Sequence, residues 1–358
     1  MLESRNQRIG LGVAVAVVVL AGAVAAFALG GGGDATDATT TTASTTTTAA
    51  PTTTAAAGPL APLTGLPLRD GRVASQIALV VKVDNVEPKS RPQIGINQAD
   101  VVYEERVEGS VTRLLAVFHS TGSIPVGPVR SARTSDIAIV TPLGRPYFAW
   151  SGANSIFAAR IHASRVVDVG YDRVPNQYYR EHSRHAPDNL MLRSTNDIWA
   201  LPHVGSTPPP VLFHFRGPGQ TTAFLTKVAG VHITFGSTAG SAPVDYRWNG
   251  TGWARFQKGT PHVDAAGVQV APANVIIQFV DYRPTDVKDQ FGVLIPEAQT
   301  VGQGEAWVLT QGGLVKAHWS KPNINAVTTY EDQSHQPILL TPGRTWIALP
   351  PKGGAVPL

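Results

Sequence analysis

The first 59 residues contain no segment that can build a folded domain. Residues 9–29 form a run of 21 uncharged, mostly apolar residues, and Arg5 and Arg8 precede it. Such a run is long enough to cross the roughly 30 Å hydrocarbon core of a bilayer as a helix. Positive charge before the span predicts a cytoplasmic N-terminus and an extracytoplasmic remainder. We therefore expect residues 1–8 to be a cytoplasmic tail and residues 9–29 a transmembrane signal-anchor.

The same run has a second interpretation. Ala23-Val24-Ala25 resembles the small-x-small site at which a secretory signal peptide is cleaved, and cleavage there would give a secreted protein. The core of a signal peptide usually spans about 7–15 apolar residues. Because this run is longer, the sequence favours the uncleaved anchor.

Residues 30–59 consist mainly of glycine, threonine and alanine. A segment with so few large apolar side chains cannot bury a core, so we expect a disordered linker that holds the rest of the chain away from the membrane. The composition becomes typical of a globular protein from Leu60 onwards. About 300 residues then remain, which is enough for one large domain or two ordinary ones.

The composition of the whole chain excludes several classes of site. There is no cysteine among the 358 residues, which rules out disulfides, thiolate metal ligands, cysteine nucleophiles and a lipidated cysteine. The net charge is +4 and the pI is near 9.4, but the basic residues form no run. Nucleic-acid-binding proteins usually cluster their basic residues. We therefore expect no nucleic-acid partner.

Apolar runs in the first half predict strands alternating with helices. We expect strands at residues 77–83, 101–107, 111–118 and 147–150, a hairpin turn at 108–110, and helices at 130–140, 155–162 and 196–201. A helix over residues 130–140 would begin just after Pro128 and end before Pro142.

The second half has a different pattern. Residues 203–210 contain Gly205 and three consecutive prolines, and we place a boundary there between subdomains 60–207 and 208–358. We expect short strands at residues 212–215, 232–235, 245–248, 253–256, 274–279, 307–310, 314–319, 338–340 and 345–349. The chain is therefore predicted to be α+β, with a mixed α/β N-terminal subdomain and a mainly antiparallel β C-terminal subdomain.

Acids, arginines and an amide interrupt the apolar strands between residues 84 and 133. The members of this polar cluster are Asp84, Asn85, Arg91, Asp100, Glu104, Glu108, Arg113, Arg130 and Arg133. On the expected helix, Arg130 and Arg133 would share a face near the N-terminus, which favours a carboxylate or phosphate ligand. The alternative is a buried Glu–Arg network that holds the helix to the hairpin.

Glu104 is the candidate catalytic residue of this cluster, as a general acid if burial raises its pKa. On a straight strand, Glu104 and Glu108 would be roughly 13 Å apart. Glycosidase carboxylate pairs lie about 5–9.5 Å apart, so the two can form such a pair only if the chain bends at Glu108. The hairpin would place Arg113 opposite Glu105 or Arg106.

Two further groups of residues allow a functional and a structural interpretation. His182 and His185 could share a helical face and bind zinc. Arg180 and Arg184 add positive charge there and Pro187 limits the helix, so we expect no metal site and no cofactor. Tryptophans of the second half either stack on sugars or form a β core. These are Trp248, Trp253, Trp307, Trp319 and Trp346.

The spacing of several motifs resembles the YerB-type family of bacterial envelope proteins, many of them lipoproteins, which have a two-part domain of unknown function. The first-half motifs are Asp84-Asn85, Arg91-Pro92-Gln93, residues 99–104, Glu108-Gly109, Thr112-Arg113 and residues 127–133. The second-half motifs are Asn274-Val275, Gly302-Gln303-Gly304, the region of Trp319 and residues 342–347. The resemblance covers roughly residues 60–350 and implies an envelope location and a bipartite fold, but no activity.

The chain departs from the family pattern in two places. It has no cysteine to carry a lipid, so the N-terminal helix must provide any anchor. Asp188 precedes Asn189 where the family tends to have a histidine, so no role of that histidine can be carried over to this chain.

The combined expectation is a membrane-anchored extracytoplasmic envelope protein that binds a cell-wall component such as peptidoglycan, or an envelope protein. The alternative is a peptidoglycan-active glycan hydrolase or transglycosylase with Glu104 as general acid. An accessible cleft at Glu104 would favour the enzyme, whereas a sealed Glu–Arg network would favour a structural role. A third interpretation, a sensor of small anions at Arg130 and Arg133, requires an open positive pocket.

Overall fold

The computed structural model describes residues 58–68, 70–238, 241–289 and 292–358. They belong to one compact unit, Ala56–Leu358. The expected tail, the expected anchor and almost all of the expected linker lie outside the described residues. Within the described ranges, no helix is long and apolar enough to cross a membrane.

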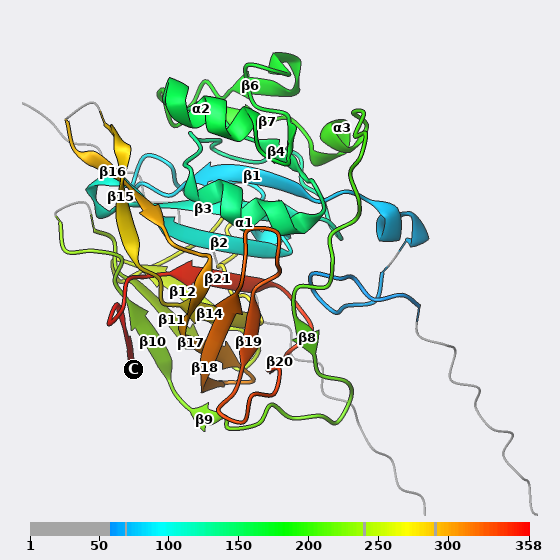
Figure 1. The fold of residues 1–358 in the computed structure, drawn as a ribbon, viewed down its shortest axis with the longest axis vertical. Coiled ribbons are helices and arrows are strands. Elements are labelled where there is room, and N and C mark those ends of the chain that lie inside the picture. Colours follow the sequence, from blue (N-terminus) through cyan, green and yellow to red (C-terminus); the bar gives the residue numbers. More distant parts are fainter. Residues whose placement is uncertain (1–57, 69, 239–240, 290–291) are drawn as a thin grey trace, which may run out of the picture. The chain divides into compact units, whose positions relative to one another are not determined.

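One large sheet runs through both predicted subdomains (Figure 1). It has 11 strands in the order β19-β18-β17-β14-β21-β2-β3-β1-β4-β5, with β9 paired to β18. The first half supplies β1 (Leu79–Asp84), β2 (Val101–Arg106), β3 (Thr112–Phe118), β4 (Tyr147–Ala149) and β5 (Val167–Asp168). The second half supplies β9 (Thr226–Lys227), β14 (Asn274–Gln278), β17 (Gly302–Thr310), β18 (Gly313–Lys321), β19 (Thr329–Glu331) and β21 (Thr345–Leu349).

Strand β21 joins the two halves. It lies between β2 and β14 and runs parallel to both, with Trp346 opposite Val102 on one side and Val275 on the other. All five β21 residues are buried. The backbone hydrogen bonds of a strand from the C-terminal end therefore complete the sheet of the first half.

The remaining strands form smaller sheets. A five-stranded antiparallel sheet has the order β13-β12-β11-β10-β22. Its strands are β10 (Gly230–Ile233), β11 (Val244–Trp248), β12 (Trp253–Gln257), β13 (Thr260–Pro261) and β22 (Ala355–Pro357). Three two-stranded sheets pair β15 (Tyr282–Lys288) with β16 (Leu294–Ala298), β8 (His214–Phe215) with β20 (Leu339–Leu340), and β6 (Tyr178–Arg180) with β7 (Leu190–Leu192).

The helices are short. They are α1 (Ser135–Val140), α2 (Ser155–His162) and α3 (Thr195–Trp199), and the 3₁₀ turns are η1 (Gly71–Ser75), η2 (Ile96–Gln98), η3 (Glu108–Ser110), η4 (Thr141–Leu143) and η5 (Pro175–Gln177). Asn154 and Ser194 cap α2 and α3, because each side chain accepts a backbone N–H two residues on. The helices expected near 155–162 and 196–201 are confirmed.

The helix expected over residues 130–140 was wrong in its first half. α1 begins only at Ser135. The backbone N–H of Arg130 donates to the Lys82 carbonyl, and that of Ala132 donates to the Gly152 carbonyl. The Arg130 carbonyl accepts the Ser151 N–H, and the Ser131 carbonyl accepts the Arg113 guanidinium. Because neighbouring segments bond both the N–H groups and the carbonyls of this backbone, residues 130–133 form no helical turn. Arg130 and Arg133 therefore do not share a helix face.

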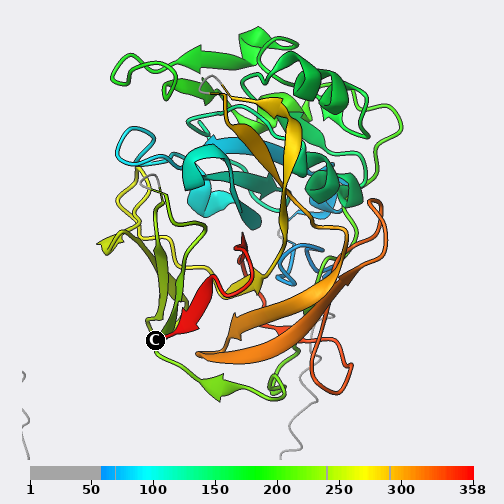
Figure 2. The same cartoon turned by 60° about the vertical axis from the view of Figure 1, so that its left-hand side comes forward.

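Side chains that alternate along the strands of the large sheet pack into two cores, one on each face. Leu79, Val81 and Val83 of β1 face a core that includes Val231, Tyr246 and Trp253 of the five-stranded sheet, whereas Val80 faces a core that includes Ile139 and Val140 of α1 and Ile161 of α2. In Figure 2 the green helices lie at the top and upper right, the orange strands of the large sheet at the bottom, and the yellow-green five-stranded sheet at the lower left. Charged strand residues point into both layers, and each needs a partner there.

Candidate functional site

The nine residues of the predicted polar cluster do not form one site. Three of them, Asp84, Glu104 and Arg113, lie on strands of the large sheet, where neighbouring residues point to opposite faces, and the other six lie outside those strands. Three groups result, namely a network around Glu104, a network around Glu105, and a pair of aspartates that reaches a cleft.

Glu104 belongs to a sealed network. Arg255 of β12 donates its Nη2 to both carboxylate oxygens, at 2.8 and 2.9 Å, and neither side chain has any exposed surface. Asn85 and Thr112 also donate to Oε1, at 3.2 and 2.8 Å. Glu104 lines none of the cavities described below. This geometry supports the structural interpretation of Glu104, and its partner is an arginine that the sequence did not single out.

The network extends into the second half of the chain. Gln257 Oε1 accepts from Asn85, Arg91 and Arg255. His262 lies between Arg255 Nη1, 2.6 Å from Nδ1, and Gln93 Oε1, 2.8 Å from Nε2. Burial and the charges of the two arginines hold the pKa of His262 well below its usual value. A neutral imidazole that accepts at Nδ1 and donates at Nε2 satisfies both contacts.

The opposite face carries a buried lysine with two acids. Lys82 Nζ donates to Glu105 at 2.5 Å and to Asp136 at 2.7 Å, and all three side chains are fully buried. Burial raises the pKa of Glu105 to about 7, against the attraction of Lys82. Asp136 also accepts the backbone N–H of Arg133 at 2.7 Å. This triad fixes the start of α1 to the sheet.

The other predicted residues have local partners. Arg113 lies opposite Glu105, one of the two expected registers, but its guanidinium donates to the Ser131 carbonyl at 2.9 Å. Glu108 forms an ion pair with Arg133 in the turn η3. The carboxylate of Asp100 accepts the N–H groups of His119 and Ser120 at 2.7 Å each, and burial raises its pKa to about 6.

The third group lies at the end of β1. Asp84 is fully buried, accepting Arg130 Nε at 2.7 Å and the Asn85 N–H at 2.8 Å. Its carboxyl group is also hydrogen-bonded to that of Asp188, whose Oδ1 is 3.8 Å from Arg130 Nε. Burial first, and the contact with Asp84 second, raise the pKa of Asp188 to about 6. Although burial opposes it, the hydrogen bond with Asp188 and the charges of Arg130 and Arg113 hold the pKa of Asp84 below its usual value.

Asp188 lines a cleft of about 550 Å³. The other lining residues are Lys89, Arg91, Pro92, Ser183, Arg184, His185 and Ala186. They come from the loop after β1 and the loop between β6 and β7. In Figure 2 the blue loop after β1 lies below the green β6–β7 segment and above the yellow β12–β13 hairpin. A second groove of about 560 Å³ lies on the other side of Arg91 and Pro92, against Lys258, Pro261 and Val263.

The first cleft is rich in positive charge. Arg91 pairs with Glu87 at 2.7 Å, but no acid within 4.0 Å pairs with Lys89 or Arg184 in the part of the chain that the structure describes. Arg184 Nη2 donates to the Pro92 carbonyl, which links the two loops. Its Nη1 is buried without a partner. Lys89 and Arg184 therefore leave positive charge in this cleft without an acidic partner, which would favour an anion there.

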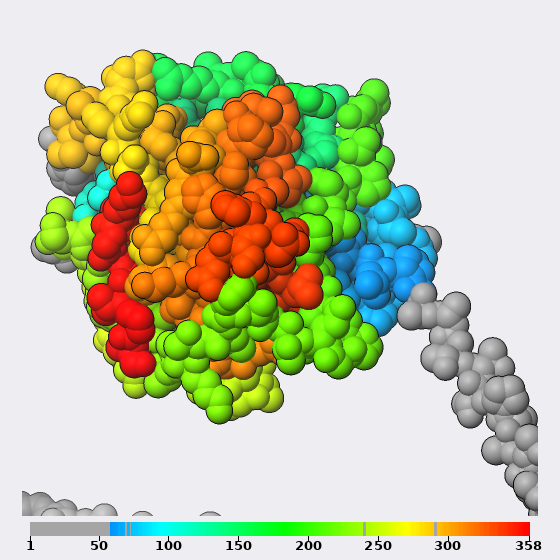
Figure 3. All heavy atoms as spheres, turned by 60° about the horizontal axis from the view of Figure 1, so that its bottom comes forward, coloured from blue at the N-terminus to red at the C-terminus, as the bar shows by residue number. Residues whose placement is uncertain are grey.

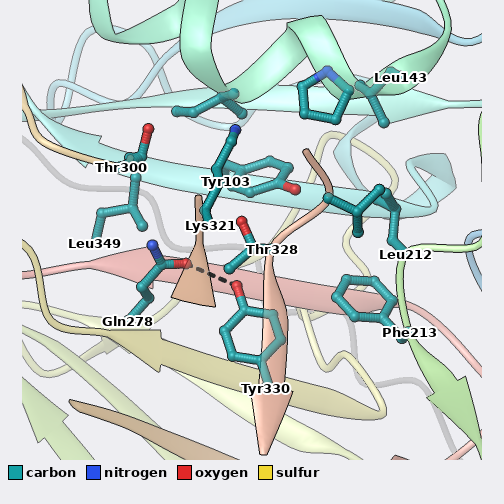
Figure 4. A pocket seen from close by; sticks show the side chains of 13 residues that line it. Tyr103, Leu143, Leu212, Phe213, Gln278, Thr300, Lys321, Thr328, Tyr330 and Leu349 are labelled. Carbon is teal, nitrogen blue, oxygen red and sulfur yellow. Dashed lines mark hydrogen bonds between the residues drawn. The ribbon is translucent and has the colours of Figure 1, made fainter. Parts of the chain in front are cut away.

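Two other cavities lie near the second core. The first is narrow, with room for about 20 Å³, and contains Lys321, Tyr103 and Tyr330 (Figure 4). Lys321 donates to the Ala138 carbonyl, and burial lowers its pKa to about 8. The second is an apolar groove of about 280 Å³ between Val211, Ile276 and Pro337. The orange segments of β18 and β19 and the green segments of β8 and β9 make up much of the face in Figure 3.

The tryptophans belong to the core. Trp253, Trp319 and Trp346 are at most 3% exposed, and Trp248 and Trp307 pack against the core while partly buried. His182 and His185 lie in an exposed turn rather than on a helix. Within the described ranges, no group of three or more histidine or acidic residues is placed to hold a metal ion.

Comparisons with known proteins identify the family. Residues 63–202 match the family described as "Protein of unknown function (DUF3048) N-terminal domain", and residues 231–347 match its C-terminal domain. A relative in Bacillus subtilis, described as "Putative lipoprotein YerB", is 26% identical over 308 residues, covering 81% of this chain and 86% of the relative. The crystal structure of YerB protein from Bacillus subtilis superposes with a TM-score of 0.70 at 24% identity, covering 84% of this chain and 99% of that chain. The chain therefore belongs to the DUF3048 family, and the resemblance stated from its motifs is confirmed.

Proposed function

We propose that this DUF3048 protein binds an anionic component of the bacterial cell wall in the cleft lined by Lys89, Arg91, Arg184 and Asp188. The shared chemistry of the ligand is a carboxylate or phosphate on a wall polymer, and peptidoglycan, with its peptide carboxylates, is the ligand we favour. The observation that carries the proposal is that Lys89 and Arg184 both line the cleft, and neither has an acid within 4.0 Å among the residues that the structure describes.

The envelope setting is part of the proposal. A relative is described as a lipoprotein, and the N-terminal sequence favours an anchor and a spacer. A folded unit on such a spacer can reach polymers outside the membrane. The unpaired cations of the cleft would then meet the fixed negative charge of the wall.

The test is co-sedimentation of residues 58–358, which belong to one compact unit, with purified cell walls. A Lys89→Ala/Arg184→Ala variant removes both unpaired cations from the cleft. We expect its affinity to fall at least ~10-fold, since one hydrogen bond to a charged group is worth about 1.5–3 kcal/mol and 1.4 kcal/mol is tenfold. Walls with and without their phosphate-rich polymers separate a phosphate ligand from a carboxylate ligand.

The matched control is Lys227→Ala/Lys352→Ala, which removes the same charge from two exposed lysines away from the cleft. We expect this control to sediment like the parent protein. If both variants lose the same affinity for the wall, the attraction is a general effect of net charge. If the parent protein does not sediment with either wall preparation, wall binding is excluded and a protein partner becomes the subject of search.

A further inference from the structure

We propose that the cleft is also a catalytic site, in which Asp188 is the acid that cleaves a glycosidic bond of an anionic wall glycan. The inference rests on the proposed function, because the glycan must first bind in the cleft. The proposed acid is Asp188, which lines a cavity, and not Glu104, which is fully buried against Arg255.

The geometry gives the two aspartates different positions. Asp84 has no exposed surface and is held by Arg130 and the Asn85 N–H. The Asp188 side chain is 8% exposed and lines the cleft. Asp84 therefore acts as a positioning residue, and Asp188 is the member of the pair that can touch a ligand.

The charges around the pair place the proton on the side of the cleft. The charged groups that act on Asp188 are Asp84, Arg130 and Lys89. Burial and the neighbouring Asp84 favour the protonated form of Asp188, while Arg130 and Lys89 oppose it. When the environments of two neighbouring carboxyl groups separate their pKa values, the proton resides on the group with the higher pKa, which is Asp188 here.

An independent observation points to a ligand beside this acid. Arg184 lines the same cleft, and no acid lies within 4.0 Å of it among the residues that the structure describes. A carboxylate of the glycan would pair with this guanidinium through a charge-assisted hydrogen bond. Such a contact would hold the polymer next to Asp188, and orientation of this kind contributes strongly to rate.

The groups around Asp188 narrow the reaction class. Hydrolases of the two-carboxylate type need a second acid about 5–9.5 Å away, and Asp188 is the only carboxyl group among the residues that line the cleft. Glu87, on the adjoining groove, is paired with Arg91. The Ser183 hydroxyl donates to Glu181 at 3.2 Å rather than to a histidine, so no serine nucleophile is prepared. A single acid is sufficient when the sugar supplies its own nucleophile.

The proposed cleavage of the glycosidic bond needs neither water nor a cofactor. Asp188 donates its proton to the bridging oxygen of the glycosidic bond, and the bond between that oxygen and the anomeric carbon breaks. A hydroxyl oxygen of the same sugar bonds to the anomeric carbon. The proton of that hydroxyl then passes to the Asp188 carboxylate, which restores the acid. The products are one chain with a free hydroxyl and one with an intramolecular anhydro end.

The test incubates residues 58–358 with peptidoglycan freed of other polymers at pH 5.5, and measures both sedimentation and soluble fragments by mass spectrometry. We expect fragments with anhydro ends, one water lighter than hydrolytic ends. Asp188→Asn should reduce their release at least ~100-fold, the lower range for loss of general acid catalysis. Its sedimentation should be no weaker than that of the parent protein, because the change removes an acid from a positive cleft.

The Asp84→Asn variant gives a second test, which is the pH dependence of fragment release. A purely structural role of Asp84 would leave this pH dependence unchanged. Loss of the Asp84 charge should lower the pKa of Asp188, so the pH at which release is half-maximal should shift to a lower value. A uniform loss of rate at every pH would contradict the positioning role.

The other outcomes separate the two proposals. Sedimentation without fragments overturns the catalytic inference and leaves binding intact. Absence of sedimentation overturns both. Hydrolytic ends, or equal release by Asp188→Asn, would also overturn the assignment of Asp188 as the single acid.

Discussion

Glu104 and Asp188 are carboxylic acids of one polar region with opposite environments. Glu104 is surrounded by Arg255, Asn85 and Thr112 and has no exposed surface, whereas Asp188 shares a hydrogen bond with Asp84 and lines a cleft. Full burial against a paired cation favours a structural role for an acid, whereas access to a cavity makes the acid available for chemistry.

Glu104→Gln should destabilise the fold without affecting wall binding. The change leaves the fully buried Arg255 without its counter-ion, and breaking a buried pair in this way costs about 3–5 kcal/mol. Thermal unfolding should show a melting temperature lowered by roughly 5–10 °C. The control is Glu108→Gln, whose side chain is 20% exposed beside Arg133 and should cost about 1 kcal/mol or less. A melting temperature of Glu104→Gln equal to that of the control would refute the internal ion pair.

Lys321→Met should stabilise the protein at neutral pH. Burial lowers the pKa of Lys321 from 10.5 to about 8, so charging this lysine at pH 7 costs about 3 kcal/mol more in the folded state. Loss of the hydrogen bond to the Ala138 carbonyl costs about 1 kcal/mol, so the free energy of unfolding should rise by about 2 kcal/mol in total.

The pH dependence of this gain has a definite sign. Because the folded pKa is depressed, the parent protein has no charging cost above pH 10.5, and the cost grows as the pH falls and is complete below about pH 8. The difference between Lys321→Met and the parent protein should therefore be largest below pH 8 and should shrink towards pH 10.5. Urea titrations across this range measure it, and a difference that is independent of pH would contradict the account.

At the scale of elements, the sequence predicted most of the longer strands but not their partners. Buried strands such as β1, β3, β14 and β21 are nearly continuous apolar runs, which a sequence shows directly. Strand β15 was missed because it is largely exposed and contains Pro284. The two-residue strands β5, β9 and β13 were missed because so short a segment has no readable periodicity. The N-terminal half of the expected 130–140 helix was wrong because neighbouring segments bond the backbone N–H groups and carbonyls there, which is a tertiary effect.

Trp346→Ala should test the role of β21 as the shared strand. The side chain is 2% exposed, and truncation of a buried tryptophan costs about 3–5 kcal/mol. Because β21 pairs with β2 on one side and β14 on the other, both halves should lose stability together. Calorimetry should show one transition, shifted to lower temperature. Two separate transitions would show that the halves unfold independently and would contradict the shared-sheet account.

At the scale of the whole molecule, the candidate site comes from segments that only the fold brings together. Asp84 ends β1, Arg130 lies in the extended segment before α1, and Asp188 lies in the loop before β7. The sequence indicated Asp84 and Arg130 as members of a polar cluster, and it marked Asp188 only as a departure from the family pattern. Their hydrogen bonds could not be inferred, since no local periodicity relates residues so far apart. Arg255, Gln257 and His262 were missed for the same reason.

Hydrogen exchange of residues 58–358, with and without purified cell walls, would test whether a wall polymer binds in the cleft, because it locates the ligand on the molecule. We expect the backbone amides of residues 86–91 and 181–188, the two loops of the cleft, to be protected from exchange. Exchange in the β17–β18 hairpin should change little. Lys89→Ala/Arg184→Ala should abolish that protection, and Lys227→Ala/Lys352→Ala should retain it. Protection confined to the apolar groove around β8, β19 and β20, with unchanged exchange in both cleft loops, would contradict the account.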